Sequence, residues 1–134
     1  MSKGNQYEND VVAWRLNGTA MPNIGANVVL HLHTADPGEG GDSTTNRATY
    51  TNYTGVNVAR DGSGWTVVGN SGTNATLVQF PACAAGADDQ LITHLSMTGT
   101  GEGGFVSGAL TTPIRVTQLV QPQFPIAAIL YQED

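Results

Sequence analysis

The residues best suited to chemistry are His31 and His33, which stand two positions apart in a run of alternating residues. In a strand, side chains at i and i+2 point to the same face, so the two imidazoles would lie side by side. Such a pair can bind a metal ion when a third ligand converges on it, and His94, Cys83 or Asp36 could supply that ligand. No cysteine pair or carboxylate at a fixed offset completes a metal motif, however. The sequence favours histidines that are half-exposed or lie at an interface, with no catalytic, cofactor or metal role.

A second group of candidate ligands lies in the long connection Ala35–Asn46, where Asp36, Glu39 and Asp42 recur at every third position. Their spacing suggests calcium, but the twelve-residue helix-loop-helix pattern of calcium loops is absent. Connections of this length without internal structure are usually functional or mobile. We therefore expect Asp36 and Glu39 to lie on an exposed loop that contacts a partner.

The glycine-rich run Gly99–Gly104 matches the letters of a dinucleotide-binding fingerprint, but its context differs. That fingerprint requires a strand before the glycines and a helix after them. Here the chain continues into a further alternating, strand-like run from Phe105. The run is therefore predicted to be a hairpin tip.

One segment near the N-terminus has the pattern of a short amphipathic helix. Asn5 is an acceptable N-cap, Glu8 stands at the capping-box position and Gly18 is a plausible stop. Its apolar stripe is formed by Tyr7, Val11 and Trp14. A helix this short is marginal by itself, so its stripe must dock on the chain's own core, on another subunit or on a partner.

After Pro22 the hydrophobic period becomes two, which indicates strands. The expected strands are Asn27–His33, Val56–Arg60, Trp65–Val68, Ala75–Phe80, Leu91–Met97, Phe105–Leu110, Ile114–Val120 and Ile126–Tyr131, with a possible one at Ala48–Tyr53. The turn at 61–64 is expected to join two of them as a hairpin. These elements predict an all-β fold, an antiparallel jelly-roll-like β-sandwich over residues 21–134 that carries an N-terminal helical segment over residues 1–20. Its core is expected to include Trp65, Val67, Leu77, Phe80, Leu95 and Val116.

The charge balance excludes several partners. The 134 residues carry 5 Lys+Arg against 11 Asp+Glu, a formal net charge of −6, and Lys3 is the only lysine. No basic stripe is available for nucleic acid or for an anionic membrane surface. Only 12% of residues are charged, about half the usual share, which favours a surface that meets other protein. No signal peptide is evident, so we expect synthesis in a host cytoplasm.

Several stretches resemble a family of small tailed-bacteriophage virion proteins, whose members are labelled tail-fibre proteins or capsid decoration (cement) proteins. The resemblance runs nearly from end to end. It is carried by Ser2–Asn5, Tyr7–Asp10, the motif LHTADPGE at Leu32–Glu39, Tyr53–Val56, Gly64–Val67, Phe80–Ala82, Ser107–Leu110 and the closing Glu133-Asp134. It implies a structural protein with no enzymatic activity.

The resemblance implies a capsid decoration subunit on the outer surface of the virion head, with a tail or tail-fibre component as the alternative. The expected partners are the major capsid protein and further copies of the chain, as a dimer or trimer. The candidate interface residues are Tyr7, Val11, Trp14, His31, His33, Asp36, Glu39, Leu130 and Tyr131. The alternative for the aromatic and aliphatic members is that they fill the chain's own core.

Overall fold

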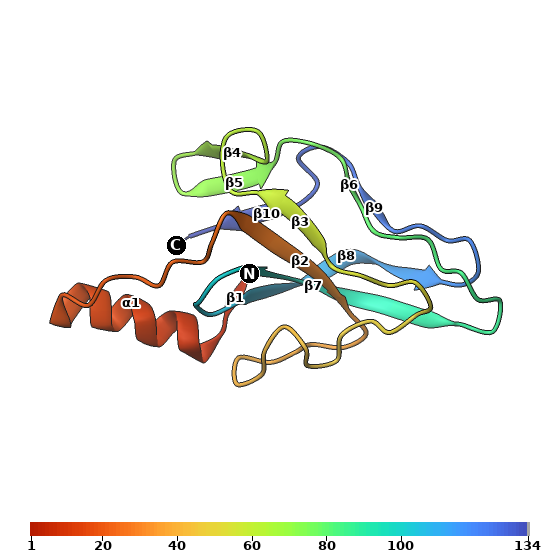
Figure 1. Cartoon of the computed structure of the whole chain (residues 1–134), viewed down its shortest axis with the longest axis horizontal. Coiled ribbons are helices and arrows are strands. Elements are labelled where there is room, and N and C mark those ends of the chain that lie inside the picture. The colour runs from red at the N-terminus through yellow and green to blue at the C-terminus, as the bar shows by residue number, and fades with distance from the viewer. Residues whose placement is uncertain (134) are drawn as a thin grey trace.

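Within residues 1–133 the chain forms ten strands, of two to eleven residues, and one helix (Figure 1). The computed structural model describes residues 1–133, so Asp134, the last residue of the expected sandwich domain, lies outside the described residues. The strands are β1 (Ser2–Lys3), β2 (Asn27–His33), β3 (Val56–Ala59), β4 (Trp65–Val68), β5 (Ser71–Asn74), β6 (Val78–Gln79), β7 (Gln90–Gly99), β8 (Val106–Val116), β9 (Gln123–Phe124) and β10 (Leu130–Gln132), and the helix is α1 (Asn5–Asn17). The predicted all-β fold with one N-terminal helix is confirmed.

The largest sheet has five strands in the order β1-β8-β7-β2-β3, and all of its pairs are antiparallel. Strands β7 and β8 form a long hairpin whose tip is the glycine-rich run after Gly99, as the sequence predicted. The pairing shifts between Ile92 and His94, where β8 carries extra residues. This irregularity accommodates Pro113, since a residue outside the regular ladder needs no backbone N–H.

Two smaller sheets, β10-β5-β4 and β6-β9, cover one face of the large sheet and complete a sandwich (Figure 1). The core lies between these layers. Its fully buried centre is formed by Leu30, Leu32, Val78, Phe80, Cys83, Ile92 and Val116. The ring of Phe80 stacks on Tyr53 at 6.3 Å and meets Phe124 edge-on at 6.1 Å. The sandwich is therefore confirmed, while the jelly-roll connection pattern stays a prediction.

The structure corrects the expected strand pairing. The turn at 61–64 does not join a hairpin, because β3 pairs with β2 and β4 pairs with β5. The chain crosses from one layer to the other at this turn. The run 105–120 contains one strand instead of two, the run 75–80 keeps only β6, and 48–53 forms no strand. Period-two patterning identifies extended chain but does not select its partner, which explains these errors.

The expected core is confirmed in part. Phe80, Leu95 and Val116 are buried and Trp65 is half-buried, but Val67 is 73% exposed and Leu77 is 48% exposed. Val67 and Trp65 line the same apolar groove, which is described below. The Val67 side chain therefore lies on the same side of β4 as Trp65, as expected, although it is exposed. Leu77 is out of phase, because the neighbouring Val78 takes the inward position.

We predict that Phe80→Ala will lower the free energy of unfolding by about 3–5 kcal/mol, because it removes a buried ring and leaves a cavity between Tyr53 and Phe124. Leu77→Ala, three residues away and exposed, is the matched control and should change stability by about 0.5 kcal/mol or less. Urea unfolding measures both. Equal losses in the two variants would contradict this assignment of the core.

Candidate interaction surface

Helix α1 begins and ends at glycines. The N-cap is Gly4, which is extended and makes no side-chain capping bond, so the predicted cap at Asn5 is wrong by one residue. A Cβ on Gly4 would lie 2.8 Å from the ring of Phe105, which explains why glycine stands there. The predicted stop at Gly18 is confirmed: it has φ 68° and its N–H donates to the carbonyl of Ala13. Glycine adopts this left-handed conformation without steric cost.

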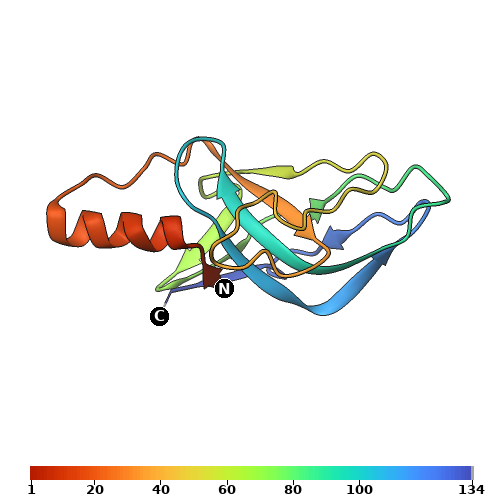
Figure 2. The ribbon, with the colours of Figure 1, turned by 90° about the horizontal axis from the view of Figure 1, so that it is seen from below.

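The helix projects beyond one end of the sandwich and its second half stands clear of both layers (Figures 1 and 2). None of its 13 residues is buried. Trp14 is 51% exposed, Val12 56% and Leu16 76%. The predicted single stripe is wrong in one respect: Val12 and Leu16 lie away from the side that Tyr7, Val11 and Trp14 share, at the 3.6-residue period of a helix. A helix with apolar residues on several sides is typical of a buried helix.

The first turn of the helix, around Tyr7, is called its root here. Glu133, near the C-terminus, holds this root in place. The Tyr7 hydroxyl donates to Glu133 Oε1 at 3.0 Å, the Tyr131 hydroxyl donates to the same oxygen, and Lys3 Nζ lies 2.6 Å from Glu133 Oε2. Burial, followed by the hydrogen bond and charge of Glu133, raises the pKa of Tyr7. One carboxylate therefore joins the two ends of the chain.

An apolar groove opens beside this root, between the large sheet and the small sheet β10-β5-β4. Its volume is about 270 Å³ and no charged residue lines it. Its walls are Tyr7, Ile24, Val28, Trp65, Val67, Gly72, Met97, Thr98, Gly104, Val106 and Tyr131. Tyr7 also lines a second hollow of about 580 Å³ that continues along the helix past Val11, Trp14 and Met21. Lys3, Glu8 and Glu133 also line this hollow, so the apolar residues of the helix share it with charged groups, whereas the groove itself has none.

The structure brings four of the expected interface residues to this surface. Tyr7 and Tyr131 line the groove, and Val11 and Trp14 line the hollow beside it. Sequence reasoning missed the rest of the groove, because Ile24, Met97 and Val106 come from segments that only the tertiary fold places together. No signal in the sequence distinguished these positions, since Val67 has the pattern of a core residue and only the structure shows that it is exposed.

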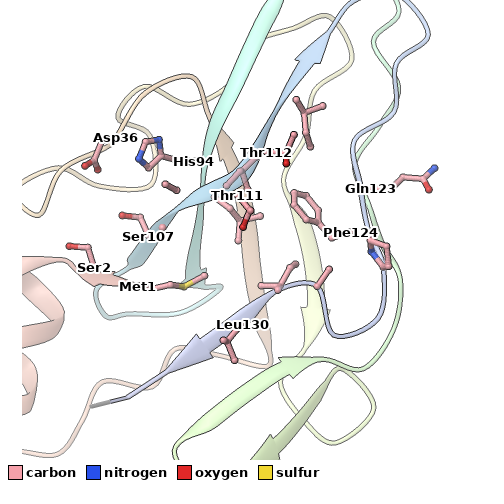
Figure 3. Close-up of a pocket in the computed structure, with 18 residues that line it drawn as sticks. Met1, Ser2, Asp36, His94, Ser107, Thr111, Thr112, Gln123, Phe124 and Leu130 are labelled. Carbon is pink, nitrogen blue, oxygen red and sulfur yellow. The ribbon is translucent and has the colours of Figure 1, made fainter.

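Leu130 instead lies at the border of a larger cleft of about 920 Å³ between β8 and the segment 123–130 (Figure 3). Thr111, Thr112 and Phe124 line its centre, while Asp36 and His94 stand near one end. These two groups are engaged separately: His94 Nδ1 lies 2.8 Å from Thr93 Oγ1, and Asp36 Oδ1 accepts from the N–H of Gly38. Among residues 1–133, three or more histidine, cysteine or acidic residues nowhere converge as metal ligands would.

The loop carboxylates shape the loop's own structure. Glu39 Oε1 accepts from Ser2 Oγ at 3.2 Å, and the Glu39 carbonyl accepts from the N–H of Asn5. Asp42 Oδ1 accepts from the N–H and hydroxyl of Thr44. Loop 35–46 is therefore held against β2 and the start of α1, although Asp36 and Glu39 remain exposed.

His31 and His33 belong to a hydrogen-bonded network beneath that loop. His33 is fully buried, with Nδ1 2.8 Å from the Thr45 carbonyl and Nε2 2.7 Å from Ser96 Oγ. Because a carbonyl only accepts, Nδ1 carries the proton and Nε2 accepts from Ser96. His31 is half-buried, with Nδ1 3.2 Å from the Tyr53 hydroxyl, whose oxygen accepts from the N–H of Leu32. The side chain of His33 is thus unavailable at the surface of a single copy.

The buried environment disfavours the charged form of both histidines. Burial, then the charges of Arg47 and His33, lowers the pKa of His31 from 6.5 to about 4. Burial also lowers the pKa of His33, although its hydrogen bond to Thr45 acts in the opposite direction. Both imidazoles are therefore neutral in the folded chain near neutral pH.

A family model described as "Podophage GP4 fiber I protein gp80" matches residues 2–132, nearly the whole chain. No curated protein matches it. Within residues 1–133, no helix has the length and apolar character needed to cross a membrane.

We predict that Glu133→Gln will loosen the root of α1, because it removes the charge that Lys3 and the two tyrosine hydroxyls share. Hydrogen exchange should become faster at the amides of residues 3–10, while global stability falls by no more than about 1 kcal/mol. Glu102→Gln, on the exposed hairpin tip, is the matched control. Unchanged exchange at residues 3–10 would show that Glu133 does not hold the helix.

We also predict that acid will destabilise the fold between about pH 6.5 and pH 4. The unfolded chain binds a proton at His31 below pH 6.5, whereas the folded chain resists it until about pH 4, so stability is complete above this window and falls as the pH drops. The loss from His31 is roughly 2–3 kcal/mol. His31→Gln should flatten this part of a stability-against-pH curve from urea unfolding, with His94→Gln as the matched substitution. A slope that His31→Gln leaves intact would contradict this role.

Proposed function

We propose that this chain, which belongs to the podophage GP4 fiber I protein family, is a fibre component of the virion that attaches through the α1 end of its sandwich. Family membership makes it a structural protein of a phage virion. The observation that supports attachment at this end is that a projecting helix with exposed Trp14 and Leu16 buries no residue on its own chain. Exposed aromatic residues are frequent anchors in protein interfaces.

The geometry suits a mechanical part. The sandwich is held by a continuous core, while the projecting helix and the apolar groove lie together at one end. The groove carries no charged residue, so covering it requires no desolvation of a charge. Function of this kind requires contact and rigidity, with no chemical turnover. Self-association as a dimer or trimer is part of this proposal.

Capsid decoration is the second candidate, with the major capsid protein as the partner and the outer head surface as the location. A specific observation favours it: exposed apolar side chains also occur outside the groove and the helix, with Leu119 80% exposed and Ile126 66% exposed. A subunit of a surface lattice needs contacts in more than one direction, whereas a fibre subunit attached at one end needs fewer.

Copy number in purified virions separates the two candidates. Quantitative mass spectrometry against the major capsid protein should give few copies, in proportion to the symmetry of the tail, and immunogold labelling should mark the tail vertex. Hundreds of copies with label over the whole head would establish decoration instead. Absence of the chain from purified particles would overturn both candidates.

A further inference from the structure

Strand β4 lies at the outer end of the sheet β10-β5-β4 and leaves one edge of that sheet free (Figure 1). Within residues 1–133 the only strand that pairs with β4 is β5. Positions 66–70, from β4 into the turn that follows it, are all exposed. A free sheet edge presents unpaired backbone N–H and carbonyl groups, and these can pair with a strand of another molecule.

The hydrogen-bond alternation shows which backbone groups lie on this free edge. The N–H of Ala75 donates to the carbonyl of Gly64, so Gly64 directs its carbonyl to the β5 side. Successive residues of an antiparallel strand alternate between its two sides, so Trp65 and Val67 direct their backbone groups to the free edge. The N–H of Trp65 donates to the carbonyl of Asp61. The N–H and the carbonyl of Val67 have no partner within residues 1–133.

The side chains of this edge are apolar on both faces of the sheet. Val67 lines the groove, Val68 lies on the opposite face, and each is 73% exposed. A partner packed against one face would contact only one of these valines. A strand that lies in the plane of the sheet contacts both and also pairs with the backbone of Val67. The partner that fits this edge is therefore another β-strand.

The chain protects the edge of its large sheet but leaves the edge of β4 unprotected. The outer edge of β8 is partly covered by β1, which carries Lys3, and its pairing with β7 is irregular near Pro113. Charged residues, prolines and irregular pairing are the features that prevent edges from pairing with each other. Strand β4 has none of them, and the stretch 62–70 carries no charge. Two copies, each with a net charge of −6, can therefore meet at this edge without repulsion between like charges.

We propose that two copies of this chain pair β4 with β4 in antiparallel orientation, around a two-fold axis at Val67, and so join their three-stranded sheets into one six-stranded sheet. In this register the N–H of each Val67 donates to the Val67 carbonyl of the other copy. Val68 lies beside Thr66 of the other copy. A second copy presents the same donor and acceptor, so one two-fold contact satisfies both groups on both chains.

This contact specifies the self-association that is part of the proposed function and to that extent rests on it. Its tests use the purified chain in solution, whereas the location of the chain in the virion is tested by copy number in particles. Failure of the one is therefore distinguishable from failure of the other.

The first test removes the hydrogen-bond donor. Val67→Pro deletes an N–H that points away from β5, so the β4-β5 pairing should survive, as circular dichroism can verify. Val67→Thr keeps the N–H and the branched shape and is the matched control. Sedimentation velocity over a range of concentrations should show a dimer for the wild type and for Val67→Thr. Val67→Pro should be monomeric or dissociate at a concentration about tenfold higher or more.

The second test examines the register. The two-fold axis places the two side chains at position 67 next to each other, so Val67→Lys and Val67→Glu should each be monomeric through repulsion of like charges. An equimolar mixture of the two variants should form a heterodimer, because the paired charges are then opposite. A mixture that stays monomeric would overturn the proposed register and with it the proposal.

Hydrogen exchange at the amide of Val67 gives a measurement at the edge itself. This N–H has no partner in a single copy, so its exchange should become slower as the concentration rises and the dimer forms. A wild type that stays monomeric, or that forms an oligomer other than a dimer, would overturn the proposal. So would a dimer in which the Val67 amide exchanges as fast as in the monomer, since that dimer would use another surface.

Discussion

The fold depends on the apolar contact between the inner face of the five-stranded sheet and the two small sheets that cover it. Leu30 and Leu32 face this layer from the central part of the large sheet, and Phe80 fills it from the opposite side. The small sheets have two or three strands each, too few to be stable alone, so they persist only because they cover the large one. The fully buried side chain of Asn74 holds the small sheets in place. Its Nδ2 donates to the carbonyls of Thr76 and Pro125, and its Oδ1 accepts from the N–H of Ile129.

One end of the sandwich combines an apolar groove with the projecting helix. An open apolar groove lies between the large sheet and the sheet β10-β5-β4, beside the first turn of α1, with Trp65 and Val67 of β4 in its wall. The helix beside that groove is apolar on several sides and buries nothing. Stability and interaction are thereby separated in space: the closed part of the sandwich holds the fold, and its open end presents the apolar surface.

His31 and His33, the residues whose spacing first suggested a metal site, instead hold neighbouring segments of the fold together. His33 and His31 join β2 to the loop after it and to the segment before β3, through Thr45, Ser96 and Tyr53. A Cβ on Gly55 would collide with the His31 ring, so this position requires glycine. The stretches LHTADPGE and Tyr53–Val56, which carried the family resemblance, are thus two halves of one packed unit. Their spacing in sequence gave no sign of this contact.

The fold class, the helix with its stop at Gly18 and most of the strands could be predicted from the amino-acid sequence alone. So could the burial of Phe80, Leu95 and Val116. These follow from local rules, because a period of two or 3.6 and a left-handed glycine are properties of neighbouring residues. Only the tertiary structure decided that β3 and β4 lie in different sheets, that His33 is buried, and that Val67 faces an uncovered groove. Pairing and cover depend on which distant segments meet, and an apolar residue has the same pattern whether its covering layer comes from its own chain or from elsewhere.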